Sequence, residues 1–292
     1  MSGKIIGIVI LVIVAFGLFV PLGSSGSNGD SSIAVTYGET TYNNHEYKQM
    51  VDEYFEKNGN VNLNDTDEKV ITSNDVNRIS SGISQRTYNS NQIFSCAMVD
   101  LNGNNNIKID VDPKITTVTP SMYKSALDSA GIKKGHVVVT SPVTATGESA
   151  LAGIMKAYET ATGQLIPEEV KNAANNEIYT QSEVVNNTNL SADDVAQLVD
   201  EAKEEVAKEN TTDKQTIINI VNNIASNNNI QIAGDDINNL ADSIQQTQSV
   251  QDQASQYQSQ VSNYVNSENA HNLFDMIWRR IQSFLDTNLP QK

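Results

Sequence analysis

The sequence is poor in the residues that most often build metal sites and reactive centres. It has one cysteine and three histidines among 292 residues. The lone cysteine, Cys96, excludes an intrachain disulfide and a metal site made of several thiolates. His45, His136 and His271 lie far apart in sequence, without the spacing of a helical zinc site. We therefore expect no metal and no cofactor. Because Cys96 lies in the apolar run "NQIFSCAMVDLN", we predict that it is buried and unreactive.

Basic residues are also scarce. The chain has 19 Lys and Arg against 35 Asp and Glu, a formal net charge of −16. Nucleic-acid binding needs clustered cations that neutralise phosphates, so this balance argues against a nucleic-acid partner. Aromatic residues make up only 6% of the chain, which indicates a smaller buried core than a compact enzyme of this length would have.

The first 23 residues contain a long uncharged apolar run. Lys4 precedes it, and the run extends from Ile5 to Leu22, 18 residues. This length lies between a signal-peptide core and a membrane-spanning helix of about 20 residues. The positive flank is expected to stay inside, which places the rest of the chain outside the cell. We expect residues 1–23 to be a membrane anchor, with a cleaved signal peptide as the alternative, and residues 24–32 to be a Gly/Ser linker.

Residues 33–163 alternate between strand-like and helix-like patterns, which predicts an α+β layer domain. Strands are expected over 33–39, 68–73 and 136–142, and helices over 43–59 and 119–131, the latter ended by Gly131. Asn74 is predicted to cap a short helix over 74–83. The segment 90–112 predicts two strands joined by an Asn/Gly turn, a hairpin signal.

Beyond Gly163 the strand patterns stop. Residues 164–244 contain four segments with capping residues and early acidic residues, which predicts a helical C-terminal half packed as a small bundle. Ser191 and Asp194 resemble a capping box. Residues 245–267 are rich in Gln, Asn and Ser, and are interpreted as a helix or a linker. The helical interpretation rests on an apolar stripe of Val250, Ala254, Tyr257, Val261 and Tyr264.

The terminal segment, residues 268–292, has the pattern of an amphipathic helix. Two interpretations remain open: the helix folds back on the core, or its apolar face contacts a membrane surface or a partner protein. The candidate contact residues are Phe274, Ile277, Trp278, Arg279, Arg280, Ile281, Phe284 and Leu285.

The loop "TGESALAG", residues 146–153, follows a strand and begins an apolar helix, as a nucleophile elbow does. However, Leu151 replaces the small residue of that pattern, and the downstream histidine, His271, lies in the terminal segment. We therefore name no catalytic residue. A weak anion-binding loop is a second interpretation. The favoured third interpretation is structural, with Thr146 as helix cap. The anion-binding candidates are Thr146, Gly147, Glu148 and Ser149.

Part of the chain resembles a known family. The residues that carry the resemblance lie within 117–178: Met122-Tyr123, Ala126-Leu127, Ala130-Gly131, the strand "VVVTSP", and Gly147, Ala150, Leu151, Gly153, Ala157 and Glu159. With these features the chain resembles the YpuA-like exported proteins, a domain-of-unknown-function family, over about residues 33–242. The resemblance implies an exported protein of undetermined activity and carries no catalytic residue across. Members of that family often end in a Trp/Phe-rich amphipathic segment, and residues 273–285 of this chain are similar in kind.

Taken together, these patterns predict an acidic, exported, membrane-tethered protein of the cell envelope. We favour a binding or scaffolding module over an enzyme, with an envelope polymer or protein as its partner. The alternative is an envelope hydrolase that acts on wall polymer through a pair of carboxylates in one cleft. The patterns do not indicate an oligomeric state.

Overall fold

The computed structural model describes residues 32–80, 87–102 and 106–263, all within one compact unit. The predicted anchor at 1–23 and the amphipathic segment at 268–292 lie outside the described residues. Among the residues that are described, no helix is both long enough and apolar enough to span a bilayer.

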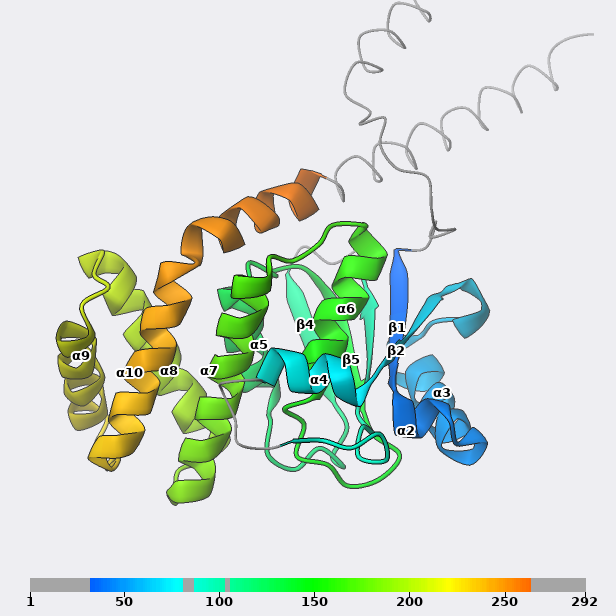
Figure 1. Cartoon of the computed structure of the whole chain (residues 1–292), viewed down its shortest axis with the longest axis horizontal. Helices are drawn as coiled ribbons and strands as arrows, with labels where there is room; N and C mark the ends of the chain where they lie inside the picture. The colour runs from blue at the N-terminus through cyan, green and yellow to red at the C-terminus, as the bar shows by residue number, and fades with distance from the viewer. Residues whose placement is uncertain (1–31, 81–86, 103–105, 264–292) are drawn as a thin grey trace, which may run out of the picture. The chain divides into compact units, whose positions relative to one another are not determined.

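The N-terminal half is built on a mixed sheet of five strands in the order β2-β1-β3-β5-β4 (Figure 1). The strands are β1 (Ile33–Gly38), β2 (Asp67–Ile71), β3 (Cys96–Asp100), β4 (Ile107–Val111) and β5 (Gly135–Thr140). The pairs β1/β2 and β4/β5 are parallel, whereas β1/β3 and β3/β5 are antiparallel. The described residues beyond β5 are mostly helical, so the predicted α+β class is confirmed.

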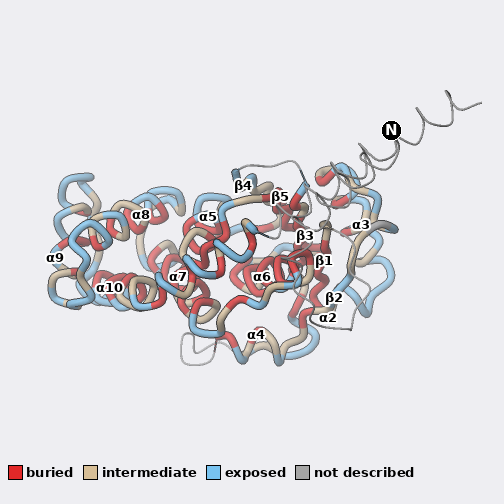
Figure 2. The backbone as a smooth tube through the Cα atoms, turned by 90° about the horizontal axis from the view of Figure 1, so that it is seen from above, coloured by how far each residue is buried: buried red, intermediate tan, exposed pale blue. Residues whose placement is uncertain are grey.

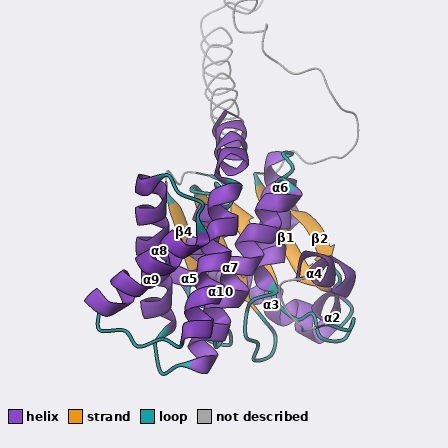
Figure 3. Ribbon diagram, turned by 60° about the vertical axis from the view of Figure 1, so that its left-hand side comes forward, coloured by secondary structure: helices purple, strands orange, loops and turns teal. Residues whose placement is uncertain are grey.

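Helices cover both faces of this sheet. On one face lie α5 (Pro120–Ser129) and α6 (Ala150–Thr162), which pack against Val99, Val137 and Val139. On the other face lies α3 (His45–Gly59), which packs against Met98 and Val138. Because successive strand residues point to opposite faces, the sheet is apolar on both sides. Figure 3 shows α6 in front of the strands, and Figure 2 shows buried residues concentrated in the sheet and in α6. The shorter elements are α2 (Glu39–Tyr42), a 3-10 turn (Leu63–Asp65) and α4 (Ser73–Ser80).

The predicted hairpin over 90–112 is wrong. Its two strands are β3 and β4, and β5 lies between them in the sheet. The reason is burial: β5 carries Val137, Val138 and Val139, all fully buried, and therefore needs cover on both faces. The β4 strand carries Lys108 and Asp110, which are better accommodated at a sheet edge. The chain from β4 crosses through α5 to reach β5 in parallel, as a βαβ unit does.

Side-chain caps explain where several helices begin. Asn44 accepts a hydrogen bond from the Tyr47 amide at the start of α3, and Thr119 does the same for α5. The predicted cap at Asn74 is wrong, because α4 already begins at Ser73. Instead, Thr72 and Asp75 bond each other's backbone N–H groups, a reciprocal arrangement that satisfies two orphan donors.

The C-terminal half contains α7 (Glu168–Asn187), α8 (Ala192–Glu209), α9 (Lys214–Asn227) and α10 (Gly234–Ser249). The predicted cap at Ser191 is confirmed, since its hydroxyl accepts from the Asp194 amide at the start of α8, and the Asp194 carboxylate accepts from that same hydroxyl. These helices share their own apolar core, centred on Leu198, Val221 and Leu240. Both α7 and α8 also contact α5 of the sheet half. The division into domains at residue 163 stays a prediction.

After a turn at Val250, a further helix covers residues 251–263. Three of its apolar residues, Ala254, Tyr257 and Val261, are buried in the same core as α5 and α6. Gly131, in a left-handed conformation with a φ of 73°, allows its close approach, because a Cβ at this glycine would overlap the Ala254 carbonyl oxygen. This polar helix therefore lies against the sheet half and forms part of its surface.

Candidate functional site

The loop that carries the sequence-predicted anion site is packed against its neighbours. Gly147 has a φ of 108°, and a Cβ there would lie 2.6 Å from Ile115 Cγ2. The Gly147 carbonyl accepts a hydrogen bond of 2.6 Å from the Tyr123 hydroxyl. Burial, with a smaller contribution from the Glu148 carboxylate, raises the pKa of Tyr123 well above its ordinary value, so this hydroxyl remains a donor. The loop is thereby fixed as the start of α6.

The structural interpretation is confirmed in that this loop leads into a helix with a buried apolar face, but the predicted cap at Thr146 and the predicted first turn at Glu148 and Ser149 are wrong. Helix α6 begins at Ala150, and no side chain caps it, so Thr146 is not the cap. The amides of Ala150 and Leu151 bond the carbonyls of Gly147 and Glu148 within the turn. Glu148 itself is buried, and a carboxylate at this position disfavours a bound anion. The anion site over 146–149 stays a prediction.

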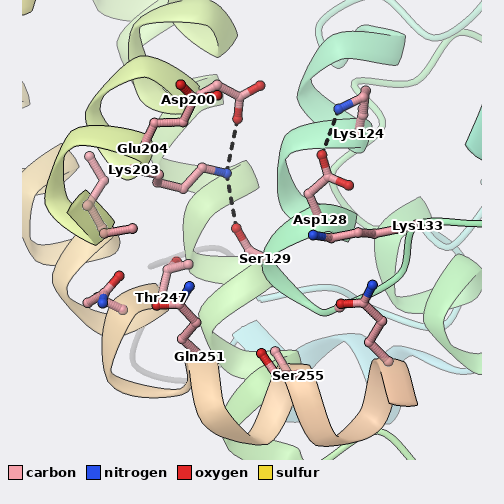
Figure 4. Close-up of a pocket in the computed structure, with 16 residues that line it drawn as sticks. Lys124, Asp128, Ser129, Lys133, Asp200, Lys203, Glu204, Thr247, Gln251 and Ser255 are labelled. Carbon is pink, nitrogen blue, oxygen red and sulfur yellow. Dashed lines mark hydrogen bonds and ion pairs between the residues drawn. The ribbon is translucent and has the colours of Figure 1, made fainter. Parts of the chain in front are cut away.

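A polar cleft lies elsewhere, between α5, α8, α10 and the helix over 251–263 (Figure 4). Its volume is about 310 Å³, within the lower part of the range of about 300–1,000 Å³ for ligand pockets. Charged, amide and hydroxyl side chains predominate in its lining. We call it the α5/α8/α10 cleft, and its polar lining residues are Lys124, Asp128, Ser129, Lys133, Asp200, Lys203, Glu204, Thr247, Gln248, Gln251, Ser255 and Gln258.

One ammonium group organises the floor of this cleft. Lys203 Nζ lies 2.8 Å from Glu177 Oε1 and 3.1 Å from Asp200 Oδ1. The same nitrogen donates to the hydroxyls of Ser125 and Ser129, at 2.8 and 3.0 Å. Figure 4 shows Lys203 reaching from α8 to Ser129 at the end of α5. The lysine therefore ties α5, α7 and α8 together beneath the cleft.

The partner carboxylate is more deeply buried than the lysine. The Glu177 side chain is 1% exposed and that of Lys203 is 16% exposed. Both Glu177 oxygens accept hydrogen bonds, from Ser125 and Gln181 at Oε1 and from Ser129 at Oε2. Buried ions persist when they are paired and their remaining hydrogen-bonding positions are filled, and this site meets both conditions.

The charges on this floor determine what it can do chemically. Burial works to lower the pKa of Lys203, but the carboxylates of Glu177 and Asp200 outweigh it, and the pKa is raised above its ordinary value of 10.5. The lysine therefore stays protonated at neutral pH and cannot serve as the general base that a Ser–Lys pair requires. The group functions as a fixed cation.

Sequence reasoning missed this floor, although its signal is present in the helical spacing. Lys203 falls between Val199 and Val206 on the buried stripe of α8. Glu177 falls beside Ala174 and Ile178 on the buried stripe of α7. A charge at a core position indicates a buried partner of opposite sign, and two such positions on neighbouring helices predict an ion pair.

The remaining sequence-predicted residues lie apart from the cleft or outside the described residues. Cys96 is buried in the sheet, as predicted, and desolvation raises the pKa of its thiol from 9.0 to about 12. The loop over 146–149 does not line the cleft. The candidate contact residues of the terminal segment lie outside the residues that the structure describes: Phe274, Ile277, Trp278, Arg279, Arg280, Ile281, Phe284 and Leu285.

Comparison with known proteins confirms the family that the sequence resembles. A family described as "Protein of unknown function (DUF1002)" matches residues 37–264. The uncharacterized protein YpuA of Bacillus subtilis (strain 168) is 31% identical over 184 residues, which covers 58% of this chain and 63% of that relative. The chain thus spans less than two thirds of the relative's length. No solved structure gives a significant match. Because the family match covers most of the chain, the chain belongs to the DUF1002 family of proteins of unknown function.

Proposed function

We propose that this chain is an exported, membrane-tethered binding protein of the cell envelope, and that the α5/α8/α10 cleft is its ligand site. The observation that carries the proposal is the cleft itself, a polar concavity of about 310 Å³ on a floor held by buried ionic bonds. A rigid floor lets a ligand bind without ordering the protein first, which favours affinity. The apolar run from Ile5 to Leu22 supports the export and tethering parts of the proposal.

Binding fits this geometry better than hydrolysis. Ser129 contacts both Glu177 and Lys203, but it lies in the last turn of α5, at the negative end of the helix dipole. Hydrolysis through this serine would develop a further negative charge at the same point. The nearby Lys203 ammonium is already shared between two carboxylates. The arrangement therefore lacks an activated nucleophile and a ready site for an oxyanion.

The hydrolase alternative through carboxylates stays a prediction. The cleft does gather Asp128, Asp200 and Glu204, but the first two form ion pairs with Lys124 and Lys203. If the purified chain released soluble fragments from wall polymer, and Asp200→Asn abolished that release, the hydrolase alternative would replace the binding proposal.

Co-sedimentation with insoluble wall polymer tests the binding proposal. Ser255 lines the cleft, and Ser259, one turn further along the same helix, is exposed and does not line it. We expect the wild type and Ser259→Trp to sediment alike, and Ser255→Trp to bind about tenfold more weakly because the indole fills the cleft. Circular dichroism of both variants checks their folding. Equal sedimentation of the two tryptophan variants would remove the cleft from the proposal.

A further inference from the structure

Two charged side chains of the α5/α8/α10 cleft have no ionic partner among the described residues. Lys133 follows α5, and Glu204 lies on α8. The other four charges are paired with each other, Lys124 with Asp128 at 2.6 Å and Lys203 with Asp200 at 3.1 Å. Figure 4 shows Lys133 on the α5 side of the cleft and Glu204 on the α8 side. The cleft therefore offers one cation and one anion, on different walls.

Neutral hydrogen-bonding groups make up much of the rest of the lining. Gln248, Gln251 and Gln258 each carry a side-chain amide that can donate and accept hydrogen bonds, and the Ser255 hydroxyl can do the same. Within the described part of the chain, these side chains make no hydrogen bond with one another or with other residues. Peptide groups likewise carry a donor and an acceptor, so this lining can pair with them.

The lining also limits the other ligand classes. No aromatic side chain is among the described residues that line the cleft, so a ring has no stacking surface there. Three lysines and three acids line it, which gives no excess of either sign for a strongly charged ligand. Its volume, near the lower limit of about 300 Å³ for ligand pockets, fits a short molecule.

We infer that the cleft binds a short zwitterionic peptide, whose carboxylate faces Lys133 and whose amino group faces Glu204. This inference rests on the proposed function and specifies its ligand class. Both charged side chains are exposed, so each ionic contact contributes modestly. Recognition of the two termini together, with the amides and hydroxyls on the peptide groups between them, provides the selectivity.

The test uses the full chain in detergent, with trialanine as the probe. Isothermal titration calorimetry and NMR measure the binding. Three relatives of the probe are N-acetylated, C-amidated or blocked at both ends, and a neutral N-acetylglucosamine disaccharide is the fourth comparison. We expect the unblocked tripeptide to bind most tightly and each single block to weaken binding about fivefold. Lys133→Gln should abolish the preference against the C-amide, and Glu204→Gln the preference against the N-acetyl form.

Matched controls lie next to each tested residue. Lys134→Gln and Glu205→Gln change the same charges at positions that do not line the cleft, and they should preserve both preferences. Equal binding of blocked and unblocked tripeptides, abolished by Ser255→Trp, would overturn the zwitterion inference and leave the proposed cleft standing. Binding of the disaccharide in place of the tripeptide would likewise overturn the zwitterion inference and leave the proposed cleft standing. Absence of binding by all five probes would count against both the inference and the cleft.

Discussion

Replacement of Lys203 by methionine tests the floor of the cleft. Methionine keeps much of the lysine's length but leaves Glu177, 1% exposed, without its cation. Removal of one partner from a buried pair costs about 3–5 kcal/mol, because the other charge stays buried. Glu177 keeps its hydrogen bonds from Ser125, Ser129 and Gln181, which places the expected loss at the lower end, about 3 kcal/mol.

The assays are urea unfolding and thermal unfolding, both monitored by far-ultraviolet circular dichroism. A loss of about 3 kcal/mol should lower the thermal midpoint by roughly 6–12 °C in a chain of this size. Lys208→Met is the matched control, since Lys208 is on the same helix, is 67% exposed and pairs with Glu205 at 3.1 Å. This exposed pair should contribute no more than about 1 kcal/mol. Lys203→Met combined with Glu177→Gln should recover most of the loss, because no buried charge remains.

The stabilisation by Lys203 should also depend on pH in a predictable direction. The pKa of Lys203 is raised in the fold, so its contribution is complete below the ordinary value of 10.5 and decreases as pH rises through the folded pKa. The difference between wild type and Lys203→Met should therefore be constant from pH 6 to 9 and shrink above about 10.5. A loss below 1 kcal/mol at neutral pH, or no recovery in the double variant, would refute the buried-pair reasoning.

Three further predictions concern the sheet half and the terminal segment. Burial raises the pKa of Cys96 to about 12, so its thiol should resist iodoacetamide at pH 8 in the native protein and react quickly in urea. The stability that its neutral thiol contributes should be lost as pH rises from about 9 to about 12. Rapid alkylation of the native protein would contradict the burial of Cys96. Gly153→Ala should destabilise the fold by about 1–3 kcal/mol, because its Cβ would lie 2.8 Å from Thr36 Oγ1, whereas Gly234→Ala, with open space around it, should be neutral or stabilising; equal unfolding midpoints would contradict this packing. Liposome co-sedimentation should weaken when residues 270–292 are removed, and equal sedimentation of both forms would reject the membrane contact.

Local signals predicted the elements well, and long-range competition explains the failures. The cap at Ser191 acts within a few residues, so a short window of sequence contains the whole cause. Strand order depends instead on which strand most needs burial. The Asn/Gly turn after β3 favoured a hairpin locally, but the fully buried Val137 and Val138 of β5 take the position beside β3.

The cleft was beyond sequence reasoning for the same physical reason. Its lining comes from residues 124–133, 200–207 and 244–258, and no spacing within one segment predicts how the four helices of these segments meet. The charges at Lys203 and Glu177, on otherwise apolar helix stripes, were the available indication of a buried pair. By contrast, the loop at Gly147 resembles a catalytic turn in sequence, but its glycine serves close packing against Ile115 and Tyr123.

Hydrogen exchange of the full chain, with and without trialanine, tests most directly whether the α5/α8/α10 cleft is the ligand site. We expect trialanine to slow exchange in the last turn of α5, in α8 around residues 200–207 and in the helix over 251–263, and to have no effect in Ser255→Trp. Slower exchange confined to the loop at 144–149, or the same protection in Ser255→Trp as in the wild type, would contradict this expectation.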